Sequence, residues 1–149
     1  FCGAPSWSPT GKWIAYIRFE MRSGVPGPED GIYVFDTSCL EDNQCMENQF
    51  GVIDADTNPT WLGENLLLVA KDNIISVYNI EDNKAILVNE TKTDIANIRH
   101  VVMSPDGEFL AYTAISTNNL VYITRPLDQT AQQEVLIEEA GIIGWITVP

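Results

Sequence analysis

The sequence has few of the side chains that catalysis and nucleic-acid binding most often require. It contains a single histidine, His100, among 149 residues. A zinc site of several histidines is therefore excluded, and a Ser-His-Asp triad has only one candidate base. No nucleophile-elbow, phosphate-loop or dinucleotide-binding glycine motif is present. We therefore expect a chain that is not an enzyme and that holds no cofactor.

Positive charge is also scarce. Lys and Arg together number 8 against 21 Asp and Glu, which leaves a formal net charge of −13. A surface this acidic repels phosphate groups, so nucleic acids and anionic membranes are poor partners. Long apolar runs are missing as well, since a run such as Leu66 to Ala70 is far too short to cross a bilayer. We expect no membrane insertion, and we expect a protein partner to be basic.

Length and composition describe one globular domain. The 149 residues suffice to bury a core, and 45% of them are apolar while 19% are charged. These are the values of folded domains rather than of disordered chains. The sequence starts at Phe1 without a methionine, which is typical of a processed or excised piece of a longer protein.

A repeated motif runs through most of the chain. Its copies are the segments 5–16, 59–69 and 101–112, with a truncated copy at 143–146. Each copy carries an anchor residue at the same place, and the anchors are Trp7, Trp61, Met103 and Trp145. They are separated by 54, 42 and 42 residues, so the first repeat contains an insertion. Regular spacing of this length is typical of repeat folds such as propellers.

Every repeat predicts four short strands. The anchor segment comes first, and a Pro/Gly turn such as Ser8 to Lys12 or Ser104 to Glu108 leads into an apolar run. An alternating run rich in Ile, Val and Tyr follows, and a shorter run ends the unit. The predicted second, third and fourth strands are 13–17, 32–35 and 50–53, then 66–70, 75–80 and 85–88, then 109–113, 120–124 and 135–137. No stretch predicts a helix.

Four antiparallel strands in about 42 residues match one blade of a β-propeller. We therefore expect an all-β fold, a partial β-propeller of three four-stranded blades plus the inner strand of a fourth. The expected bounds are 1–54, 55–95 and 96–140 for the blades and 141–149 for the surplus strand. The first strand of each blade should line the central channel and be the most buried, and the fourth should face solvent and be the most polar. The tryptophans expected between blades are Trp7, Trp13, Trp61 and Trp145.

The motif also resembles a known family. The segments 7–16 (WSPTGKWIAY) and 103–112 (MSPDGEFLAY) resemble the core of TolB-type propeller repeats, which are relatives of the WD repeats. The segment 31–36 (GIYVFD) resembles the third strand of that family. Repeat two departs from the pattern, because 62–65 (LGEN) replaces the Ser-Pro-Asp-Gly turn. The resemblance implies the propeller fold, and members include periplasmic scaffold proteins and the non-catalytic propellers of prolyl-oligopeptidase-like peptidases.

Three blades do not close a ring, since known propellers have roughly four to eight. Three explanations stay open. The chain is a piece of a larger propeller, or copies of the chain assemble into a ring, or the chain forms a smaller irregular structure. In a two-copy ring, the surplus strand at 142–148 would compete with the first strand of the other copy.

The cysteines bear on the compartment. Cys39 and Cys45 flank a short loop between the third and fourth strands of repeat one, where hairpin ends lie close enough for a disulfide. We predict that they pair, which indicates an extracytoplasmic location: periplasmic, cell-surface or secreted. Two reduced thiols in a polar loop are the alternative. Cys2 is left over, and Asn89-Glu90-Thr91 forms a glycosylation sequon.

The alternating chain direction within a blade sorts its loops onto two faces. Loops after the second and fourth strands share one face, and turns after the first and third strands share the other. The insert 21–30 and the connections 54–58 and 71–73 therefore meet on the first face. The residues predicted to form a binding face there, an acidic rim with one arginine, are Arg22, Glu29, Asp30, Asp54, Asp56 and Asp72.

Asp54, Asp56 and Asn58 have the alternating spacing of the first ligands in a calcium loop. Pro59 and the lack of a closing glutamate argue against that loop, and turn hydrogen bonding before the proline is the alternative. These residues are the weak calcium candidates, and no other metal site is expected. His100, beside Arg99, is expected to be a polar edge residue rather than a base.

These observations predict a non-catalytic, extracytoplasmic propeller module for protein–protein interaction, such as a scaffold. Two alternatives stay open: the propeller domain of a larger prolyl-oligopeptidase-like hydrolase, or a calcium- or sugar-binding propeller. A G-x-S-x-G segment in the full-length gene would decide for the first. A rise in melting temperature with calcium would decide for the second.

Overall fold

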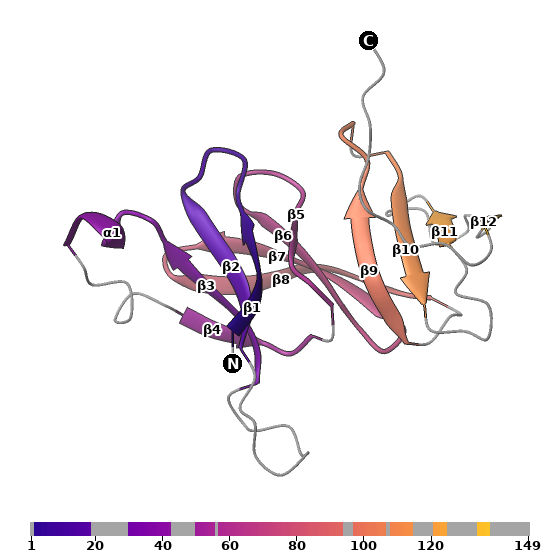
Figure 1. The fold of residues 1–149 in the computed structure, drawn as a ribbon, viewed down its shortest axis with the longest axis horizontal. Helices are drawn as coiled ribbons and strands as arrows, with labels where there is room; N and C mark the ends of the chain where they lie inside the picture. Colours follow the sequence, from indigo (N-terminus) through magenta and orange to yellow (C-terminus); the bar gives the residue numbers. More distant parts are fainter. Residues whose placement is uncertain are drawn as a thin grey trace.

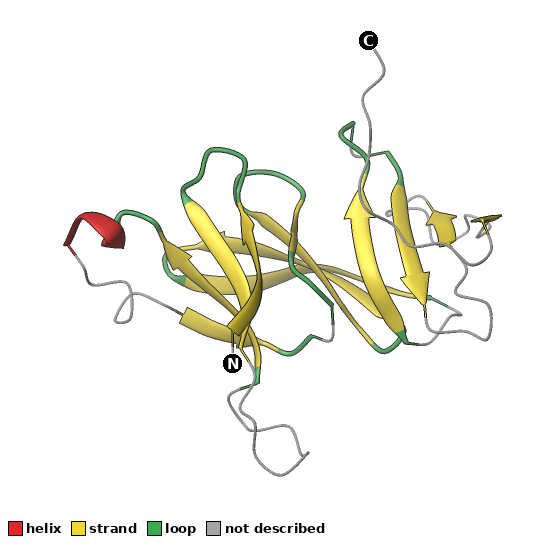
Figure 2. Ribbon diagram, in the orientation of Figure 1, coloured by secondary structure: helices red, strands yellow, loops and turns green. Residues whose placement is uncertain are grey.

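The computed structural model describes residues 2–18, 30–42, 50–55, 57–93, 97–106, 108–114, 121–124 and 134–137. These residues form three four-stranded antiparallel sheets that lie side by side (Figure 1). Within each sheet the strands follow one another in chain order. The turns and loops that the structure describes are green in Figure 2. The expected fold class is confirmed: the chain is an all-β partial propeller with three blades.

The strands of the three blades agree closely with the predicted ranges. Blade one contains β1 (Cys2–Trp7), β2 (Trp13–Arg18), β3 (Gly31–Asp36) and β4 (Phe50–Ile53). Blade two contains β5 (Thr60–Trp61), β6 (Leu66–Lys71), β7 (Ile74–Glu81) and β8 (Lys84–Lys92). Blade three contains β9 (Ile98–Met103), β10 (Leu110–Ala114), β11 (Val121–Thr124) and β12 (Glu134–Ile137). The predicted surplus strand and Trp145 lie outside the described residues.

One short helix was not predicted. The single turn α1 (Cys39–Asp42) follows β3. It is started by Asp36, whose Oδ1 accepts a 2.8 Å bond from the backbone N–H of Ser38, and Leu40 N–H then bonds to the Thr37 carbonyl at 3.0 Å. A helix of four residues is too short to show a periodic pattern of apolar residues, so it could not be predicted from the sequence. No helix in the described part of the chain is long and apolar enough to span a membrane.

The serine of the Ser-Pro-x-Gly turns closes the turn between the first two strands. Ser8 Oγ accepts a 3.0 Å bond from the backbone N–H of Trp13, and Ser104 Oγ accepts one from Phe109 at 2.9 Å. Gly11 has a φ of 79°, a left-handed conformation that glycine adopts without steric cost. The motif therefore marks the same local structure in blades one and three.

Blade two is buried on both faces, because its second strand is apolar at each position from Leu67 to Ala70. Successive strand side chains point to opposite faces of a sheet. Leu67 and Val69 join the first core, between blades one and two, and Leu68 and Ala70 join the second core, between blades two and three. The first core is Trp13, Ala15, Ile17, Ile32, Val34, Ile53, Ala55, Leu67, Val69 and Ile80. The second core is Leu68, Ala70, Ile75, Ile98, Val101, Leu110 and Tyr112.

The described tryptophans are not all in the core. Trp13 is 3% exposed in the first core, and Trp61 packs against that core while half-buried. Trp7 is 57% exposed, so its predicted place between blades is wrong. Trp7 lies opposite Ile14, on the face of blade one that points away from blade two, and no other blade in the described part of the chain covers that face.

The inner strands are less buried than predicted. Arg99 and His100 of β9 are exposed, and both residues of β5 are half-buried. The second strands are buried instead, with four consecutive buried residues in β6. Each inner strand is the edge of its sheet, so it is hydrogen-bonded on one side only, whereas the second strand is covered on both.

The outer strand of blade two faces solvent as predicted, but it is not purely polar. Ile86, Leu87 and Val88 are 43%, 48% and 54% exposed. The pairing of β8 with β7 shifts register between Val77 and Tyr78. Such a bulge interrupts the strict alternation of buried and exposed positions, which explains why three consecutive apolar side chains reach the surface.

Candidate functional site

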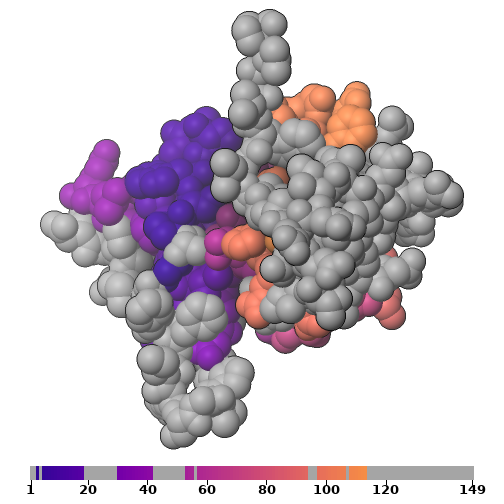
Figure 3. Space-filling view, turned by 45° about the vertical axis from the view of Figure 1, so that its right-hand side comes forward, coloured from indigo at the N-terminus to yellow at the C-terminus, as the bar shows by residue number. Residues whose placement is uncertain are grey.

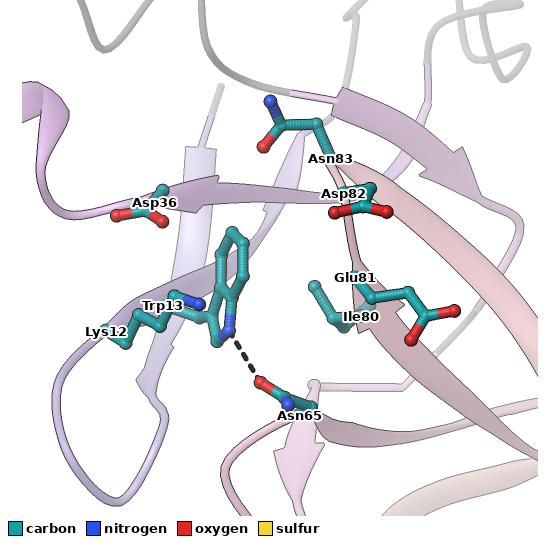
Figure 4. A pocket seen from close by; sticks show the side chains of 8 residues that line it. All are labelled: Lys12, Trp13, Asp36, Asn65, Ile80, Glu81, Asp82 and Asn83. Atoms are coloured by element: carbon teal, nitrogen blue, oxygen red, sulfur yellow. Dashed lines mark hydrogen bonds between the residues drawn. The ribbon is translucent and has the colours of Figure 1, made fainter.

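A pocket of about 340 Å³ opens between blades one and two (Figure 4). The residues that line it are Lys12, Trp13, Asp36, Asn65, Ile80, Glu81, Asp82 and Asn83. They come from the turns that follow the first and third strands of these two blades and from the adjoining ends of β2, β3 and β7. The pocket therefore lies on the face opposite the predicted rim. Its volume is at the lower end of the range for sites that hold a small molecule or a side chain.

Trp13 and Ile80 form the apolar floor of the pocket, and Asn65 accepts a hydrogen bond from each of them. Ile80 is fully buried, and Trp13 is nearly so. The Trp13 indole N–H donates a 3.0 Å bond to Asn65 Oδ1, the dashed line in Figure 4. The backbone N–H of Ile80 donates to the Asn65 carbonyl at 2.7 Å. One residue of blade two thus fixes the floor contributed by both blades.

The rim of the pocket is charged, with three carboxylates and one ammonium group. Asp36 and Asp82 stand on either side of the Trp13 ring, while the Glu81 side chain extends away from it (Figure 4). The Lys12 Nζ lies 4.6 Å from the Trp13 ring centroid, a cation–π distance. The balance of charge favours a cationic guest.

A tight hairpin places Asp82 at the pocket. Asp82 and Asn83 have φ angles of 48° and 55° between paired Glu81 and Lys84. Two consecutive left-handed residues form the two-residue turn that matches the twist of a hairpin, and Asp and Asn tolerate this conformation better than most residues. The same turn chemistry that ends β7 therefore delivers a carboxylate to the pocket.

Beside the pocket, Glu64 joins the turns of blades one and two. Its carboxylate accepts a 3.0 Å bond from Ser8 Oγ and a 2.9 Å bond from the backbone N–H of Thr10. In blade three the equivalent serine, Ser104, donates instead to Asp106 of its own turn. Blade one has Thr10 where blade three has Asp106, so Glu64 supplies from the next blade the carboxylate that this turn lacks.

Hydrogen bonding by the Thr10 side chain is the largest cause that lowers the pKa of Glu64 from its ordinary 4.5, and the bonds from the Thr10 backbone N–H and from Ser8 act in the same direction. A depressed pKa stabilises the fold above the ordinary value, and this stabilisation is lost as the pH falls through the lowered one. We therefore expect Glu64→Gln to flatten the fall of unfolding free energy below pH 4.5. Urea unfolding across that range measures it.

Glu41→Gln removes the same charge from the exposed surface of α1 and is the matched control. If Glu64→Gln and Glu41→Gln show the same acid dependence as the native chain, the bridge from Glu64 to blade one contributes nothing in solution.

The structure describes three of the six residues predicted to form the binding face. Asp54 is exposed and its carboxylate is paired with the Lys71 ammonium. Asp72 is exposed in the turn between β6 and β7, where its carbonyl accepts a 2.9 Å bond from Ile98 N–H. Asp30 is half-buried just before β3. Arg22, Glu29 and Asp56 lie outside the described residues, so the rim stays a prediction, with Asp54 already neutralised by a lysine.

The calcium candidates lie in the connection 54–58 between β4 and β5. The described residues of this connection make contacts that stabilise the fold. Asp54 binds Lys71, and Asn58 is exposed. Between them, Thr57 is buried, and its hydroxyl accepts a 2.8 Å bond from the backbone N–H of Ala70. Asp56 lies outside the described residues. Among the residues that the structure does describe, no group of three His, Cys, Asp or Glu side chains is placed to hold a metal ion.

Two further residues singled out by the sequence are placed. His100 is exposed on β9 opposite Thr113, as expected for a polar edge residue. Cys39 is 2% exposed and takes part in a disulfide. Cys45 lies outside the described residues, so the Cys39–Cys45 pairing stays a prediction.

The pocket itself was not predicted, although part of its signal is in the sequence. The Asp82-Asn83 pair between two apolar runs is a hairpin turn signal. The departure of 62–65 from the repeat pattern marked Glu64 and Asn65 as residues under a different constraint. What the sequence did not show is that this constraint comes from blade one, 52 to 56 residues away.

Three four-stranded meander sheets that pack against one another through apolar second strands are propeller blades, and this fold is shared with TolB-like propellers. The similar solved structures include TolB from Acinetobacter baumannii, with 19% identity and a TM-score of 0.59 over 89% of this chain and 32% of that one. The propeller domain of Myceliophteria thermophila Cps50 (Swd1) has 12% identity and a TM-score of 0.56 over 89% and 38% of the two chains. Prolyl oligopeptidase B from Galerina marginata has 16% identity and a TM-score of 0.58 over 92% and 22%.

These likenesses concern the fold. The chain spans between 22% and 38% of the lengths of these three structures. No protein-family model and no curated protein matches the chain.

Proposed function

We propose that the chain is a propeller module that binds a basic segment of a partner protein in the pocket between blades one and two. The observation that carries this proposal is the placement of Asp36 and Asp82 on either side of an apolar floor. A lysine or arginine side chain has an apolar stem and a charged head. Its stem would take the place of the Lys12 side chain over the Trp13 ring, and its head is attracted by the carboxylates.

The pocket supports this role better than the predicted rim does. At the rim, the Asp54 carboxylate is already paired with Lys71. At the pocket, Lys12 is the one cation among the lining residues and lies over the Trp13 ring, beside three carboxylates. The overall charge of −13 would draw a basic partner toward either face. Selectivity for one face then depends on local geometry.

A charge-matched pair of variants tests which face binds. The probe is a nine-residue peptide that alternates Arg and Gly, titrated into isotopically labelled protein at physiological salt. We expect Asp36→Asn with Asp82→Asn to weaken binding about tenfold, which is about 1.4 kcal/mol. Asn keeps the acceptor that Ser38 N–H uses, so the fold should survive. The largest chemical-shift changes should fall on the Trp13 indole and on Asn65.

The control removes the same two charges from the opposite face, as Asp54→Asn with Asp72→Asn. We expect it to weaken binding less than about twofold, as is usual for exposed charges at a distance from the contact. Equal losses in the two double variants would mean that only total charge matters, and the pocket would not be the site. A loss confined to the control would assign binding to the predicted rim.

We further propose that the chain does not itself catalyse a reaction. The sequence offers one histidine, and it lies exposed on β9, paired across the strand with Thr113. A positioned base normally needs a second residue that orients it and a nucleophile within reach. Turnover of p-nitrophenyl acetate that is lost in His100→Ala would contradict the proposal.

We also propose that the chain works outside the cytoplasm. The support is Cys39, which is both buried and disulfide-bonded, because disulfides persist in oxidising compartments. The expected outcome is an intact mass lower by two hydrogens than that of the reduced chain, and the tryptic peptide 23–71, which contains Cys39 and Cys45 but not Cys2, should carry that mass difference. A chain purified from the cytoplasm with three alkylatable thiols and unchanged stability would count against it.

A further inference from the structure

Blade one carries an aromatic face on the side that points away from blade two. Residues opposite one another on antiparallel strands share a face of the sheet. The register pairs Trp7 with Ile14, Ile14 with Phe35, and Tyr16 with Tyr33. We call these five residues the aromatic face. The alternate residues of β2, beginning with Trp13, point the other way into the first core.

The aromatic face is internally ordered and incompletely covered. The Tyr16 and Tyr33 rings stack with centroids 5.9 Å apart, and Phe35 meets Tyr16 edge-on at 6.1 Å. Trp7 is 57% exposed, and Ile14, Tyr16 and Phe35 are half-buried. Tyr33 is 8% exposed, and the Arg18 guanidinium lies 5.4 Å from the centroid of its ring. Blade one lies at one end of the row of sheets, shown in indigo to violet in Figure 3. The stacked rings form a pre-arranged apolar surface at that end.

The equivalent positions of the motif are covered in blade three. Met103, Leu110 and Tyr112 stand in the repeat where Trp7, Ile14 and Tyr16 stand in blade one, and Met103 pairs with Leu110 as Trp7 pairs with Ile14. Leu110 is 1% exposed and Tyr112 is 0% exposed, both in the second core against blade two. These positions of blade three are therefore covered by blade two, which precedes it in the chain.

Blade two follows the same rule. Its anchor, Trp61, pairs with Leu67, and both pack into the first core against blade one. The Trp61 indole N–H also donates a 3.0 Å bond to the Ser6 carbonyl in the inner strand of blade one. The two contacts between blades therefore follow one pattern. The face of a blade that carries the anchor residue packs against the second strand of the preceding blade. Where the anchor is a tryptophan, its indole N–H also bonds to a carbonyl in the inner strand of that blade.

We propose that the aromatic face docks a further propeller blade that precedes blade one and is not supplied by a second copy of residues 1–149. Its second strand would present small aliphatic side chains, as Leu68 and Ala70 do toward Leu110 and Tyr112. Its inner strand would offer a carbonyl to the Trp7 indole N–H. A second copy is the poorer occupant. Among the described residues, the comparable surface that neither core uses is that of blade three, where Ala111 and Thr113 are already buried, at 5% and 6% exposure.

The first test compares two equivalent tyrosines in the chain as it stands. In urea unfolding, Tyr112→Ala should lower the midpoint at least twice as far as Tyr16→Ala, since truncating a fully packed side chain costs more than truncating a half-exposed one. Equal shifts would show that Tyr16 is already packed within this chain, and the proposal would fail.

The second test supplies a blade. Residues 55–97, which run from the end of β4 to the start of β9, are joined ahead of Cys2, so that a copy of blade two precedes blade one. We expect Tyr16→Ala in this fusion to shift the urea midpoint as far as Tyr112→Ala does. Trp7→Ser should also become destabilising in the fusion while remaining mild in the parent chain. A fusion in which both substitutions stay mild overturns the proposal, whether or not the added segment folds.

Light scattering on the parent chain tests the source of the blade. A monomer over the measured concentration range is expected. A dimer that dissociates in Trp7→Ser would assign the aromatic face to a second copy and would overturn the choice of occupant.

Discussion

Replacing Trp13 by alanine is expected to lower the free energy of unfolding by about 3–5 kcal/mol, the usual cost of removing a buried aromatic side chain. Trp13 is 3% exposed and is the largest residue of the first core. Its loss opens a cavity between blades one and two and also leaves Asn65 Oδ1 without its indole donor. Equilibrium unfolding in urea, followed by far-ultraviolet circular dichroism, measures the change.

Trp7→Ala is the matched control for this substitution, because it removes the same side chain from the same blade. Trp7 is 57% exposed, so we expect a loss of less than about 1 kcal/mol. Trp61→Ala should fall between the two, since Trp61 is half-buried and donates to the Ser6 carbonyl. Similar losses for Trp7 and Trp13 would mean that the two faces of blade one are equally covered, against the packing described above.

The second large effect is expected in β6, where two neighbouring leucines belong to different cores. Leu67→Ala and Leu68→Ala should each cost about 2–5 kcal/mol, because both side chains are 0% exposed. Their consequences should differ in place. Leu67 packs toward blade one and Leu68 toward blade three, so each substitution should loosen one blade contact more than the other.

Amide hydrogen exchange distinguishes the two variants. In Leu67→Ala, protection should fall most in β2 and β3, and in Leu68→Ala it should fall most in β9 and β10. Leu66→Ala is the control on the same strand, since Leu66 is 38% exposed and should change little. A uniform loss of protection in both leucine variants would mean that the three blades unfold as one unit.

The strands were predictable because their signals are local. The turn residues Ser8, Pro9 and Gly11 mark where β1 ends and β2 begins, and the same signal recurs at Ser104. Continuous apolar runs then identify the second strands, and alternating runs rich in Ile, Val and Tyr identify the third. The extension of β8 to Lys92 was missed, since its last residues are polar and exposed and give no such pattern.

The side of each sheet that is covered could not be predicted from one repeat. Trp7 and Trp61 hold the same place in the motif, yet one is exposed and the other packs against a neighbouring blade. Which of them is covered depends on the presence of a preceding blade, and that information is not local. The pocket was missed for the same reason, because its floor joins Trp13 to Asn65 and Ile80 from another repeat.

The carboxylate of Glu64 has a consequence for how such a repeat array can change. Because Ser8 and Thr10 donate hydrogen bonds to a carboxylate of the following blade, the first turn of blade one is complete only when blade two follows it. A chimaera in which a duplicate of blade three follows blade one would bring Asp106, which already accepts from its own Ser104, in place of Glu64. Recombination that shuffles single blades would therefore be penalised at this boundary. Blades one and two should be exchanged or duplicated as a pair.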